Sequence, residues 1–238
     1  MIAIIGHGNV ACHLEKALKD KVDIAMVNSR TLENLPENPD VILLCVSDNA
    51  ISEVFEKIKD HEAIIAHTSG SIPMSALNRN KGKFGVFYPL QTFSKNSNLS
   101  YSEIPVFIEG NSEETVNKLK ELACLFSNNI NEADSTKRKN LHLASVFACN
   151  FTNALAGIAG DILKDSDLDF SIILPLLKET VRKLGTLTAA EAQTGPAKRG
   201  DTKVINEHLS MLKGKEQLQQ IYSLLTQYIQ NKTLPNTK

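Results

Sequence analysis

The stretch Met1-Ile-Ala-Ile-Ile-Gly-His-Gly-Asn-Val-Ala11 decides the fold of this chain. Its apolar run, Ile2 to Ile5, is typical of a buried strand, and it ends at Gly6-His7-Gly8. A helical pattern follows from about Asn9 to Leu18. The order is strand, glycine turn and helix with the spacing Gly-x-Gly-x-x-Ala, which predicts the opening of a dinucleotide-binding sheet.

Each small residue of this turn has a physical reason. Gly6 permits the tight turn, Gly8 lets a pyrophosphate approach the backbone, and Ala11 lets the helix pack closely on the strand. The helix N-terminus offers free N–H groups and partial positive charge to the phosphates. The alternative is a strand-to-helix turn that binds nothing. We predict cofactor contacts at this turn from Gly6, His7, Gly8, Asn9 and Val10.

The end of the second strand, Val22 to Val27, predicts which dinucleotide binds. Enzymes that use NAD place Asp or Glu at about this position, where a carboxylate holds the ribose 2′-hydroxyl, whereas an Arg accommodates a 2′-phosphate. This chain has Ser29 and Arg30 there. A guanidinium forms a forked, charged pair with phosphate. We therefore predict NADP(H) as the cofactor, bound by Ser29 and Arg30, although Arg30 could instead be an ordinary solvated loop charge.

The segment after Arg30 is too short for a standard mononucleotide-binding half. Only Thr31 to Pro39 precedes the next apolar run, Asp40 to Val46, and a parallel crossover needs a dozen or more residues. One helix and one strand are therefore expected to be missing, which narrows the sheet on that side. At the end of the following strand, Val46 and Ser47 are predicted to contact the cofactor, and Ser47-Asp48-Asn49 is predicted to cap a helix to about Lys59.

Further strands are predicted at Ala63 to Ala66, Phe84 to Tyr88 and Pro105 to Glu109. The first of these is followed by His67-Thr-Ser-Gly-Ser71. Small and hydroxyl residues at the carboxyl end of a parallel strand belong to the ligand-binding rim of an open α/β sheet, although such residues are also common in plain loops. A helix capped by Asn111 and Ser112 is expected to end near Phe126, and the strand signals stop after Asn128 to Glu132.

The second half of the chain is predicted to be helical. A long helix from Asp134 or Ser135 to about Leu163 carries apolar residues nearly all round, so we expect it to be buried on most sides, and we infer a dimer partner. Further helices are expected at Phe170 to Leu187, Asp201 to Leu212 and Lys215 to Gln230, and frayed residues around Pro235. The predicted fold is α/β: a Rossmann-like, mostly parallel sheet over residues 1–132, then an all-α dimerisation and substrate domain over 133–238.

Composition excludes several function classes. The net charge of −1 over 238 residues does not indicate nucleic acid or an anionic membrane as a partner. No stretch is expected to span a membrane, and no signal peptide is recognised, so we expect a cytoplasmic protein. Its four cysteines lie far apart with no Cys-x-x-Cys pair, which is typical of reduced core thiols rather than a metal site.

Four separated motifs carry a family resemblance. They are His67-Thr-Ser-Gly-Ser71, Phe87-Tyr-Pro-Leu-Gln-Thr-Phe93, the segment Leu141-His-Leu-Ala-Ser-Val-Phe-Ala-Cys-Asn-Phe-Thr-Asn153, and Thr194-Gly-Pro-Ala-Lys-Arg-Gly-Asp201. Together they resemble the bacterial family with a Rossmann-like domain and a DUF2520 domain, whose members are usually described as NADP oxidoreductases. More distantly, the plan is similar to pyrroline-5-carboxylate reductase, ketopantoate reductase and the 6-phosphogluconate and β-hydroxyacid dehydrogenases.

The resemblance implies a nicotinamide site at a domain interface, with a helical domain that many relatives use to dimerise. Ser69-Gly70 resembles the substrate-binding turn of the 6-phosphogluconate dehydrogenases. The long helix lies where β-hydroxyacid dehydrogenases carry a catalytic Lys with an Asn one turn later. Here that face instead has His142, Val146 and Asn150, so their mechanism does not transfer directly.

Candidate catalytic residues follow from what hydride transfer needs, namely positioning and a proton donor or acceptor at the substrate. His142 is the obvious candidate because histidine as a residue type ordinarily exchanges a proton near neutral pH. Asn150 and Asn153 could orient a substrate from the same helix. The alternative is a histidine satisfied inside a helical core. Arg199 would suit a substrate carboxylate or phosphate, unless it forms a surface ion pair with Asp201. We assign His142 and Asn150 to catalysis, and Ser69, Gly70, Asn153 and Arg199 to substrate binding.

Two functions remain from the sequence. The first is an NADP(H)-dependent oxidoreductase of a small carbonyl or imine compound at the interdomain cleft. The second is a non-catalytic NADP(H)-binding or sensing protein whose helical half serves dimerisation. The missing Lys favours the second, and the polar residues of the long helix favour the first.

Overall fold

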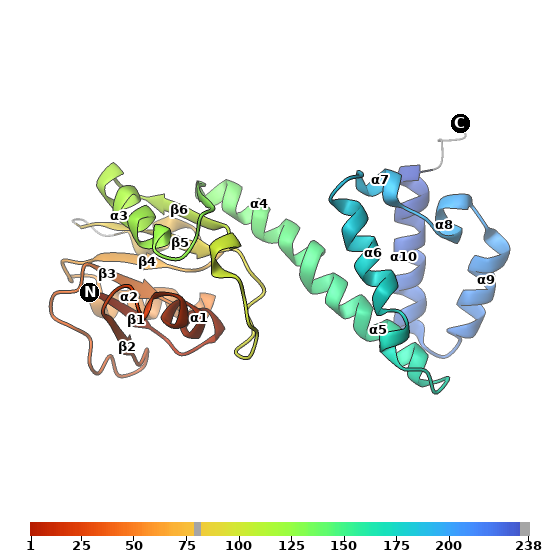
Figure 1. Ribbon diagram of the computed structural model, residues 1–238, viewed down its shortest axis with the longest axis horizontal. Coiled ribbons are helices and arrows are strands. Elements are labelled where there is room, and N and C mark those ends of the chain that lie inside the picture. Colours follow the sequence, from red (N-terminus) through yellow and green to blue (C-terminus); the bar gives the residue numbers. More distant parts are fainter. Residues whose placement is uncertain (79–81, 234–238) are drawn as a thin grey trace. The chain divides into compact units, whose positions relative to one another are not determined.

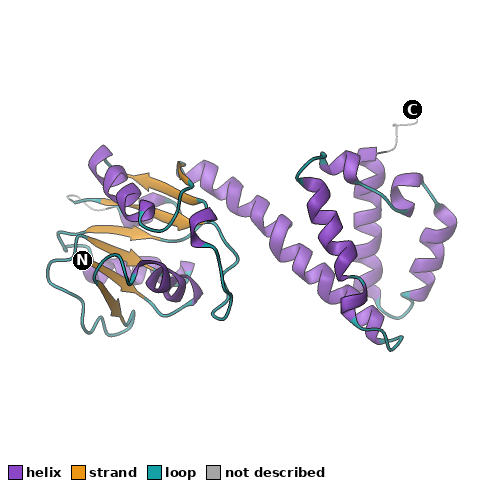
Figure 2. Ribbon diagram, in the orientation of Figure 1, coloured by secondary structure: helices purple, strands orange, loops and turns teal. Residues whose placement is uncertain are grey.

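A computed structural model describes residues 1–78 and 82–233, so the expected fraying around Pro235 lies outside the described residues. The chain divides into two compact units, Met1–Leu155 and Ala156–Lys238. The sheet and the helices that cover it belong to the first unit, and the second is helical (Figures 1 and 2). The boundary between the units falls inside the long helix rather than before it, because the first turns of that helix pack against the sheet.

One sheet of seven strands forms in the described part of the first unit, in the order β2-β1-β3-β4-β5-β6-β7. All neighbouring strands are parallel except β5 and β6, which are antiparallel. This confirms the predicted Rossmann-like, mostly parallel α/β fold. The strands are β1 (Ile2–Ile5), β2 (Ile24–Val27), β3 (Val41–Leu44), β4 (Ile64–His67), β5 (Phe84–Pro89), β6 (Val106–Gly110) and β7 (Ile130–Glu132).

The short link between β2 and β3 has the expected consequence. β3 pairs directly with the free side of β1, and β2 is the edge strand beyond which no further strand pairs in the described residues. The crossover helix and outer strand of a full mononucleotide-binding half are therefore absent there. Strand β7, in contrast, was not predicted. It has three residues, one of them Asn131, and pairs only with β6, so it carries neither an apolar run nor a clear alternation.

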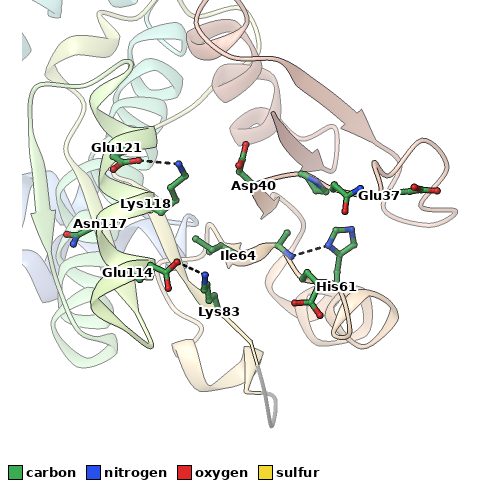
Figure 3. Close-up of a pocket in the computed structure, with 13 residues that line it drawn as sticks. Glu37, Asp40, His61, Ile64, Lys83, Glu114, Asn117, Lys118 and Glu121 are labelled. Carbon is green, nitrogen blue, oxygen red and sulfur yellow. Dashed lines mark hydrogen bonds and ion pairs between the residues drawn. The ribbon is translucent and has the colours of Figure 1, made fainter.

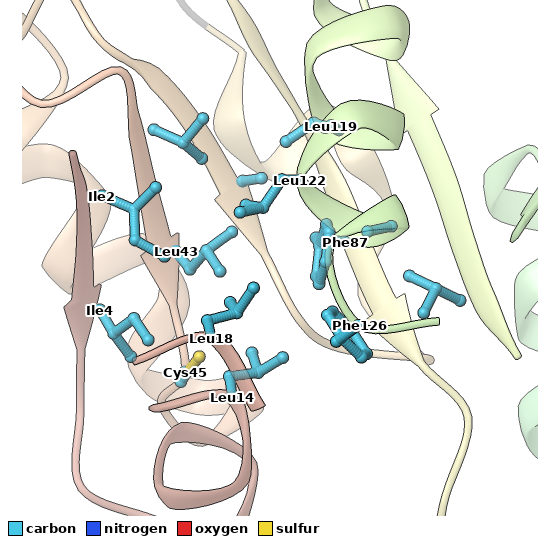
Figure 4. Close-up of a cluster of buried hydrophobic side chains, with 14 of the residues drawn as sticks. Ile2, Ile4, Leu14, Leu18, Leu43, Cys45, Phe87, Leu119, Leu122 and Phe126 are labelled. Atoms are coloured by element: carbon cyan, nitrogen blue, oxygen red, sulfur yellow. The ribbon is translucent and has the colours of Figure 1, made fainter. Parts of the chain in front are cut away.

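Two apolar clusters hold the helices onto the sheet. On one face, Ile4 and Leu43 pack with Leu14 of α1 (Asn9–Leu18) and Leu119 of α3 (Glu113–Cys124), as Figure 4 shows. On the other face, strand residues pack with α2 (Ile51–Ile58), mainly through Phe55. The result is a three-layered α/β/α unit whose parallel strands are buried on both faces, as their continuous apolar runs predict.

Helix starts follow the predicted capping in part. Ser112 accepts a hydrogen bond from the N–H of Thr115 at the start of α3, as expected. The segment after Ser47 begins instead with a 3₁₀ turn, η1 (Asp48–Ala50), and Ser47 makes no side-chain capping bond there. The Asp48 carboxylate is turned toward Ser71, whose hydroxyl donates to it, and so Asp48 ties the ends of β3 and β4 together.

The long helix runs over Ser135–Lys164 and consists of α4 (Ser135–Ser145), a π-helical segment η4 (Val146–Phe151) and α5 (Thr152–Lys164). The expectation that it is buried on most sides is wrong for the single chain. Near its start the Arg138 side chain is buried, but Leu143, Phe147 and Phe151 are exposed, Phe147 by 63%. The expectation that no stretch could span a membrane also fails, since this helix is long and apolar enough by length and composition, a test that helices of soluble proteins also pass.

The second unit consists of helices and turns in the residues that the structure describes. After η5 (Phe170–Ile172) come α6 (Leu174–Leu184), α7 (Ala189–Ala192), α8 (Pro196–Arg199), α9 (Thr202–Met211) and α10 (Glu216–Thr233). Pro175 is tolerated in the first turn of α6, where its missing N–H has no helical partner anyway. Asp201 caps α9 by accepting from the N–H of Val204. Within the described part of this unit, the buried apolar residues are Ala197 and Ile205.

Candidate active site

The carboxyl ends of β1, β2 and β3 meet at one cleft of about 550 Å³. This volume is typical of ligand pockets. Of the nine residues predicted to bind the cofactor, seven line it: Gly6, His7, Gly8, Ser29, Arg30, Val46 and Ser47. The cleft therefore brings together residues from three segments that lie far apart in the sequence.

The two glycines of the first turn have different roles. Gly6 is buried with a φ of +122°, and a β-carbon there would collide with the carbonyl oxygen of Cys45. Gly6 is therefore required by the fold itself. Gly8 has an extended backbone, and a β-carbon there would meet nothing within 4 Å. The protein does not need a glycine at position 8 for packing, so the open space beside it is available to a ligand.

Helix α1 begins at this open space. Its N-cap is Gly8, no side chain caps its first N–H groups, and its first turn has no acidic residue. A helix start with free N–H groups and no nearby carboxylate on its own first turn favours anion binding through the helix dipole. The uncapped terminus and the space at Gly8 together fit a pyrophosphate.

Two basic residues, Arg30 and Lys57, line the cleft. Arg30 is exposed and follows β2, and its backbone N–H donates to the side chain of Asn28. Lys57 of α2 also lines the cleft and pairs with Glu53, with 2.9 Å between Nζ and Oε1. The position of Glu53 and Lys57 at the cleft was not predicted from the sequence. No sequence signal indicates this position, because α2 and the segment after β2 line the same cleft only once the chain has folded.

Asn9 and Val10 do not line this cleft. The Asn9 amide donates to the carbonyl of Phe93 at 2.9 Å, and Val10 packs against the sheet. Asn9 therefore ties α1 to the loop after β5. The buried His13 strengthens the same link, because its Nδ1 lies 2.9 Å from the Tyr101 hydroxyl and its Nε2 lies 2.8 Å from the Ser94 carbonyl.

A second cavity, of about 280 Å³, lies between the end of β5 with its following loop and the long helix. It contains both residues assigned to catalysis, His142 and Asn150. Most of the lining residues that come from the long helix lie on one face of that helix, at His142, Ser145, Val146 and Cys149. The full lining is Tyr88, Leu90, Gln91, Thr92, His142, Ser145, Val146, Ala148, Cys149 and Asn150.

The π-helical segment Val146–Phe151 explains how His142 and Asn150 share this cavity. In a regular α-helix, a residue eight positions on lies about 80° past the starting face, whereas the seventh residue returns close to it. A π turn takes up one extra residue. Asn150 therefore occupies roughly the place that the seventh residue would have in an α-helix. Such π turns are frequently found at functional sites.

His142 is held by Tyr88, a residue that sequence reasoning did not single out. The Tyr88 hydroxyl lies 3.1 Å from Nδ1 of His142, and the rings meet edge to face with centroids 6.2 Å apart. Burial raises the pKa of Tyr88. A β-carbon on Gly70 would come within 2.8 Å of both the Tyr88 hydroxyl and His142 Nδ1. Gly70 is thus the residue that leaves room for this pair.

The other residues predicted to bind the substrate do not line the cavity that contains His142. Ser69 is buried, and its hydroxyl accepts from the N–H groups of Ser71 and Ile72, so it shapes the turn after β4. Asn153 is exposed and lies outside the lining of the second cavity. Arg199 is exposed on α8 of the second unit. The proposed surface pair with Asp201 is not formed, because Asp201 instead caps α9.

A buried polar group lies under the start of the long helix. Arg138 is fully buried and donates to the Glu109 carboxylate and to the Ile72 carbonyl.

His67 is also fully buried, and its Nδ1 accepts from the N–H of Ser69 at 3.2 Å. Burial and the Arg138 cation lower the pKa of His67 to about 4. His67 is therefore neutral at physiological pH and has a structural environment rather than access to a ligand.

A third hollow, of about 470 Å³, opens at the amino ends of β3, β4 and β5, on the opposite edge of the sheet (Figure 3). Four of its charged residues form two ion pairs, Lys83 with Glu114 and Lys118 with Glu121. Asp40 pairs with the amino group of Met1. It contains none of the predicted site residues. Over the described residues, no group of His, Cys, Asp and Glu could hold a metal ion.

Comparison with known proteins agrees with the resemblance drawn from the motifs. Residues 104–229 match DUF2520, a domain of unknown function. A Bacteroides fragilis protein, provisionally described as an NADP oxidoreductase, is 38% identical over 97% of both chains, with a TM-score of 0.89. No curated protein matches the chain.

More distant structures share the fold alone. A Thermotoga maritima protein is 22% identical, with 99% of this chain and all of that chain aligned and a TM-score of 0.81. An imine reductase from Myxococcus stipitatus, solved with NADP⁺, is 10% identical over 97% of this chain and 93% of that chain, with a TM-score of 0.62.

Proposed function

We propose, because this chain belongs to the DUF2520 family, that it is an NADP(H)-dependent oxidoreductase of a small carbonyl or imine compound. The observation that carries the cofactor assignment is the open space at Gly8 in front of the uncapped start of α1. The fold does not need a glycine there, whereas a dinucleotide does. The description of the Bacteroides fragilis relative supports the same cofactor.

We assign the 2′-phosphate to Arg30, with Ser29 beside it. The exposed guanidinium at the end of β2 suits a phosphate, and neither residue is a carboxylate that would repel one. Lys57, paired with Glu53, also lines this cleft. The pyrophosphate is assigned to the backbone of the Gly6-His7-Gly8 turn, and Val46 and Ser47 form the wall across it.

The reacting end of the substrate is assigned to the cavity of His142 and Asn150. When bound, NADPH supplies a hydride. The chain then has to orient the carbonyl or imine and give its heteroatom a proton. His142 is the histidine in this lining, and histidine is the side chain most often used as a general acid. The Asn150 amide can hold the substrate by hydrogen bonds. Ser69, Gly70, Asn153 and Arg199 remain predicted substrate contacts, of which Gly70 adjoins this cavity.

A non-catalytic NADP(H)-binding protein is the second candidate. The observation that favours it is the absence of lysine from the lining of the His142 cavity within the described residues. Both candidates predict cofactor binding, and only the first predicts turnover. Following NADPH absorbance over a panel of small oxo acids, aldehydes, ketones and cyclic imines separates them. Oxidation of NADPH that depends on one compound and is lost in His142→Ala supports the enzyme. Tight NADPH binding without turnover across the panel supports the sensor.

The cofactor proposal has its own test. Calorimetric titrations with NADPH and NADH compare the wild type with Arg30→Ala and with Lys19→Ala, a control that removes an exposed charge outside the cleft. We expect Arg30→Ala to lower the ratio of NADPH to NADH affinity about 10-fold, because a charged phosphate contact contributes about 1.5 kcal/mol or more. The control should leave the ratio unchanged. An unchanged ratio in Arg30→Ala would refute the role of Arg30.

We further propose that the chain forms a homodimer through its helical part. The second unit buries few apolar residues by itself, while large apolar side chains are exposed on α6 and α10, including Val181, Leu184 and Leu224. In the first unit, Phe147 and Phe151 of the long helix are exposed as well. An apolar surface of this extent, on a unit with so small a core, is typical of an obligate interface. A second copy of the chain supplies the same apolar residues and can cover them symmetrically.

We propose a cytoplasmic location. All four cysteines are free thiols, and burial raises the pKa of Cys45 to about 12, so that thiol is inert. Free, reduced cysteines are typical of cytoplasmic proteins. The apolar long helix is then explained by the dimer rather than by a lipid bilayer, and fractionation of cells that express a tagged chain separates these two explanations.

A further inference from the structure

Tyr88 and His142 come from different elements and meet at the wall of the second cavity. Tyr88 is the penultimate residue of β5, and His142 lies in the last turn of α4. The hydroxyl of Tyr88 is 3.1 Å from Nδ1 of His142, and both residues line the cavity with Asn150. The buried Gly70 backs onto both side chains. This contact engages Nδ1 of the His142 ring and leaves Nε2 without a contact to Tyr88.

The free nitrogen is Nε2. Within the described residues, Nε2 of His142 has no hydrogen-bond partner, and it is not among the buried polar atoms without partners. His13 differs in this respect, whereas His208 is also held at Nδ1 by a tyrosine hydroxyl, that of Tyr222 at 2.8 Å. Both ring nitrogens of His13 are engaged, by Tyr101 and by Ser94. His142 is therefore held at one nitrogen and open at the other.

The chemistry of the pair determines where the hydrogen lies. A neutral imidazole has one donor and one acceptor nitrogen, and a phenol can donate one hydrogen. If the Tyr88 hydroxyl donates to Nδ1, the imidazole must carry its hydrogen on Nε2. When the imidazole is charged, Nδ1 donates to the Tyr88 oxygen and Nε2 again carries a hydrogen. Burial favours the protonated phenol, which keeps Tyr88 available as the donor.

We propose that Tyr88 is a positioning residue that occupies Nδ1 of His142, so that Nε2–H is the group presented to the substrate. This inference rests on the proposed oxidoreductase function. In the reduction of a carbonyl or imine, the substrate carbon takes the hydride as NADPH becomes NADP⁺. The oxygen or nitrogen takes the proton from Nε2 of the imidazolium. His142 is then neutral, with its remaining hydrogen on Nδ1 toward the Tyr88 oxygen, until Nε2 regains a proton from the solvent. Tyr88 keeps its own hydrogen throughout.

Histidine-ring ¹⁵N–¹H NMR tests the proposal without any substrate. At a pH where His142 is neutral, the wild type should show a protonated Nε2 and an acceptor Nδ1. Tyr88→Phe removes the hydroxyl with little change in shape, and it should shift the Nδ1 resonance of His142 and admit the other tautomer. Tyr101→Phe is the matched control, because it removes the same group from His13 and should leave His142 unchanged.

Two results would overturn the proposal. One is a wild-type His142 that carries its hydrogen on Nδ1, which needs no variant and so does not depend on Tyr88→Phe folding. The other is a folded Tyr88→Phe protein whose His142 resonances match the wild type. NADPH titration of Tyr88→Phe tests the cofactor assignment separately from the role of Tyr88. Because Tyr88 lies outside the cofactor cleft, the NADPH affinity of this variant should stay within about twofold of the wild-type affinity. Failure of the wild type to bind NADPH refutes the proposed function and leaves the tautomer result standing.

A kinetic readout follows once the panel of carbonyl and imine compounds yields a substrate. Tyr88→Phe should lower kcat by about 10-fold or more with a smaller change in KM, and it should shift the limb of the pH profile that reports His142. A residue that only packs the cavity would change KM or stability and leave the pH limb in place. An unchanged pH limb would therefore count against the proposal.

Discussion

Arg138, at the start of the long helix, is fully buried and donates to the carboxylate of Glu109 on strand β6. Ser135 donates to the same carboxylate through its hydroxyl and its backbone N–H, at 2.9 and 3.0 Å. Glu109 therefore fixes the first turn of α4 to the sheet. Because α4 also carries His142, this pair determines where the catalytic candidate lies.

We expect Glu109→Gln to destabilise the protein by about 3–5 kcal/mol, because it leaves the buried Arg138 cation without a counter-charge. Urea unfolding followed by circular dichroism measures the change. Glu121→Gln is the control, since Glu121 pairs with Lys118 on the surface at 3.3 Å and should cost less than about 1 kcal/mol. Equal effects of the two substitutions would contradict a special role for the buried pair.

The two glycines of the first turn should respond differently to alanine. Gly6→Ala is expected to cost about 3 kcal/mol, because the left-handed backbone is strained for alanine and the methyl group collides with the Cys45 carbonyl. Gly8→Ala should cost about 1 kcal/mol at most, yet lower NADPH affinity about 10-fold or more. Thermal unfolding and NADPH titration of both variants test this contrast. A Gly8→Ala protein with unchanged affinity would remove the main support for the pyrophosphate site.

His67 should make stability depend on pH. Its folded pKa of about 4 lies below its unfolded value of 6.5, so the unfolded chain binds a proton first as the pH falls. The contribution is constant above pH 6.5, and stability is lost as pH falls from about 6.5 to 4. In His67→Asn, the Asn oxygen can still accept from the Ser69 N–H. Between pH 7 and 4.5, the wild type should lose about 2–3 kcal/mol more than this variant, as measured by urea unfolding.

The apolar surface of the helical part predicts a concentration-dependent assembly. Leu224→Asp places a charge on the exposed apolar residues of α10, and sedimentation should show a shift from dimer to monomer. Ser223→Asp adds the same charge to the neighbouring exposed position as a control. A wild type that sediments as a monomer at micromolar concentration would refute the homodimer.

Much of the sheet could be predicted because its determinants are local. The run Ile2 to Ile5 with Gly6 and Gly8 contains its own strand, turn and helix start, and the link Thr31 to Pro39 excludes a crossover by length alone. Strand β7 could not be predicted. Its three residues form a strand because β6 lies beside them, and β6 is also the strand that reverses direction.

The candidate site could be predicted only in part. Seven residues that line the first cleft follow from the order of glycine turn and strand ends, which a Rossmann-like sheet brings together. Tyr88 lies in the motif Phe87-Tyr-Pro-Leu-Gln-Thr-Phe93, but its contact with His142 joins segments distant in the sequence and could not be predicted from the motif. The place of Lys57 at the cleft depends on the fold in the same way. The burial of the long helix was overestimated because an apolar helix surface looks the same in sequence whether the chain itself or another molecule covers it.

The π-helical segment makes the spacing between His142 and Asn150 depend on the number of residues as well as on their identity. Removal of the single codon for Ala148 would let the helix return to regular α geometry while keeping every polar residue of the cavity. Asn150 would then become the seventh residue after His142 in a regular helix, and the gene would tolerate this shortening better than a one-codon insertion, which would turn Asn150 away. Deletion and insertion of one codon at Ala148 therefore test whether the side chains of His142 and Asn150 act on one bound molecule.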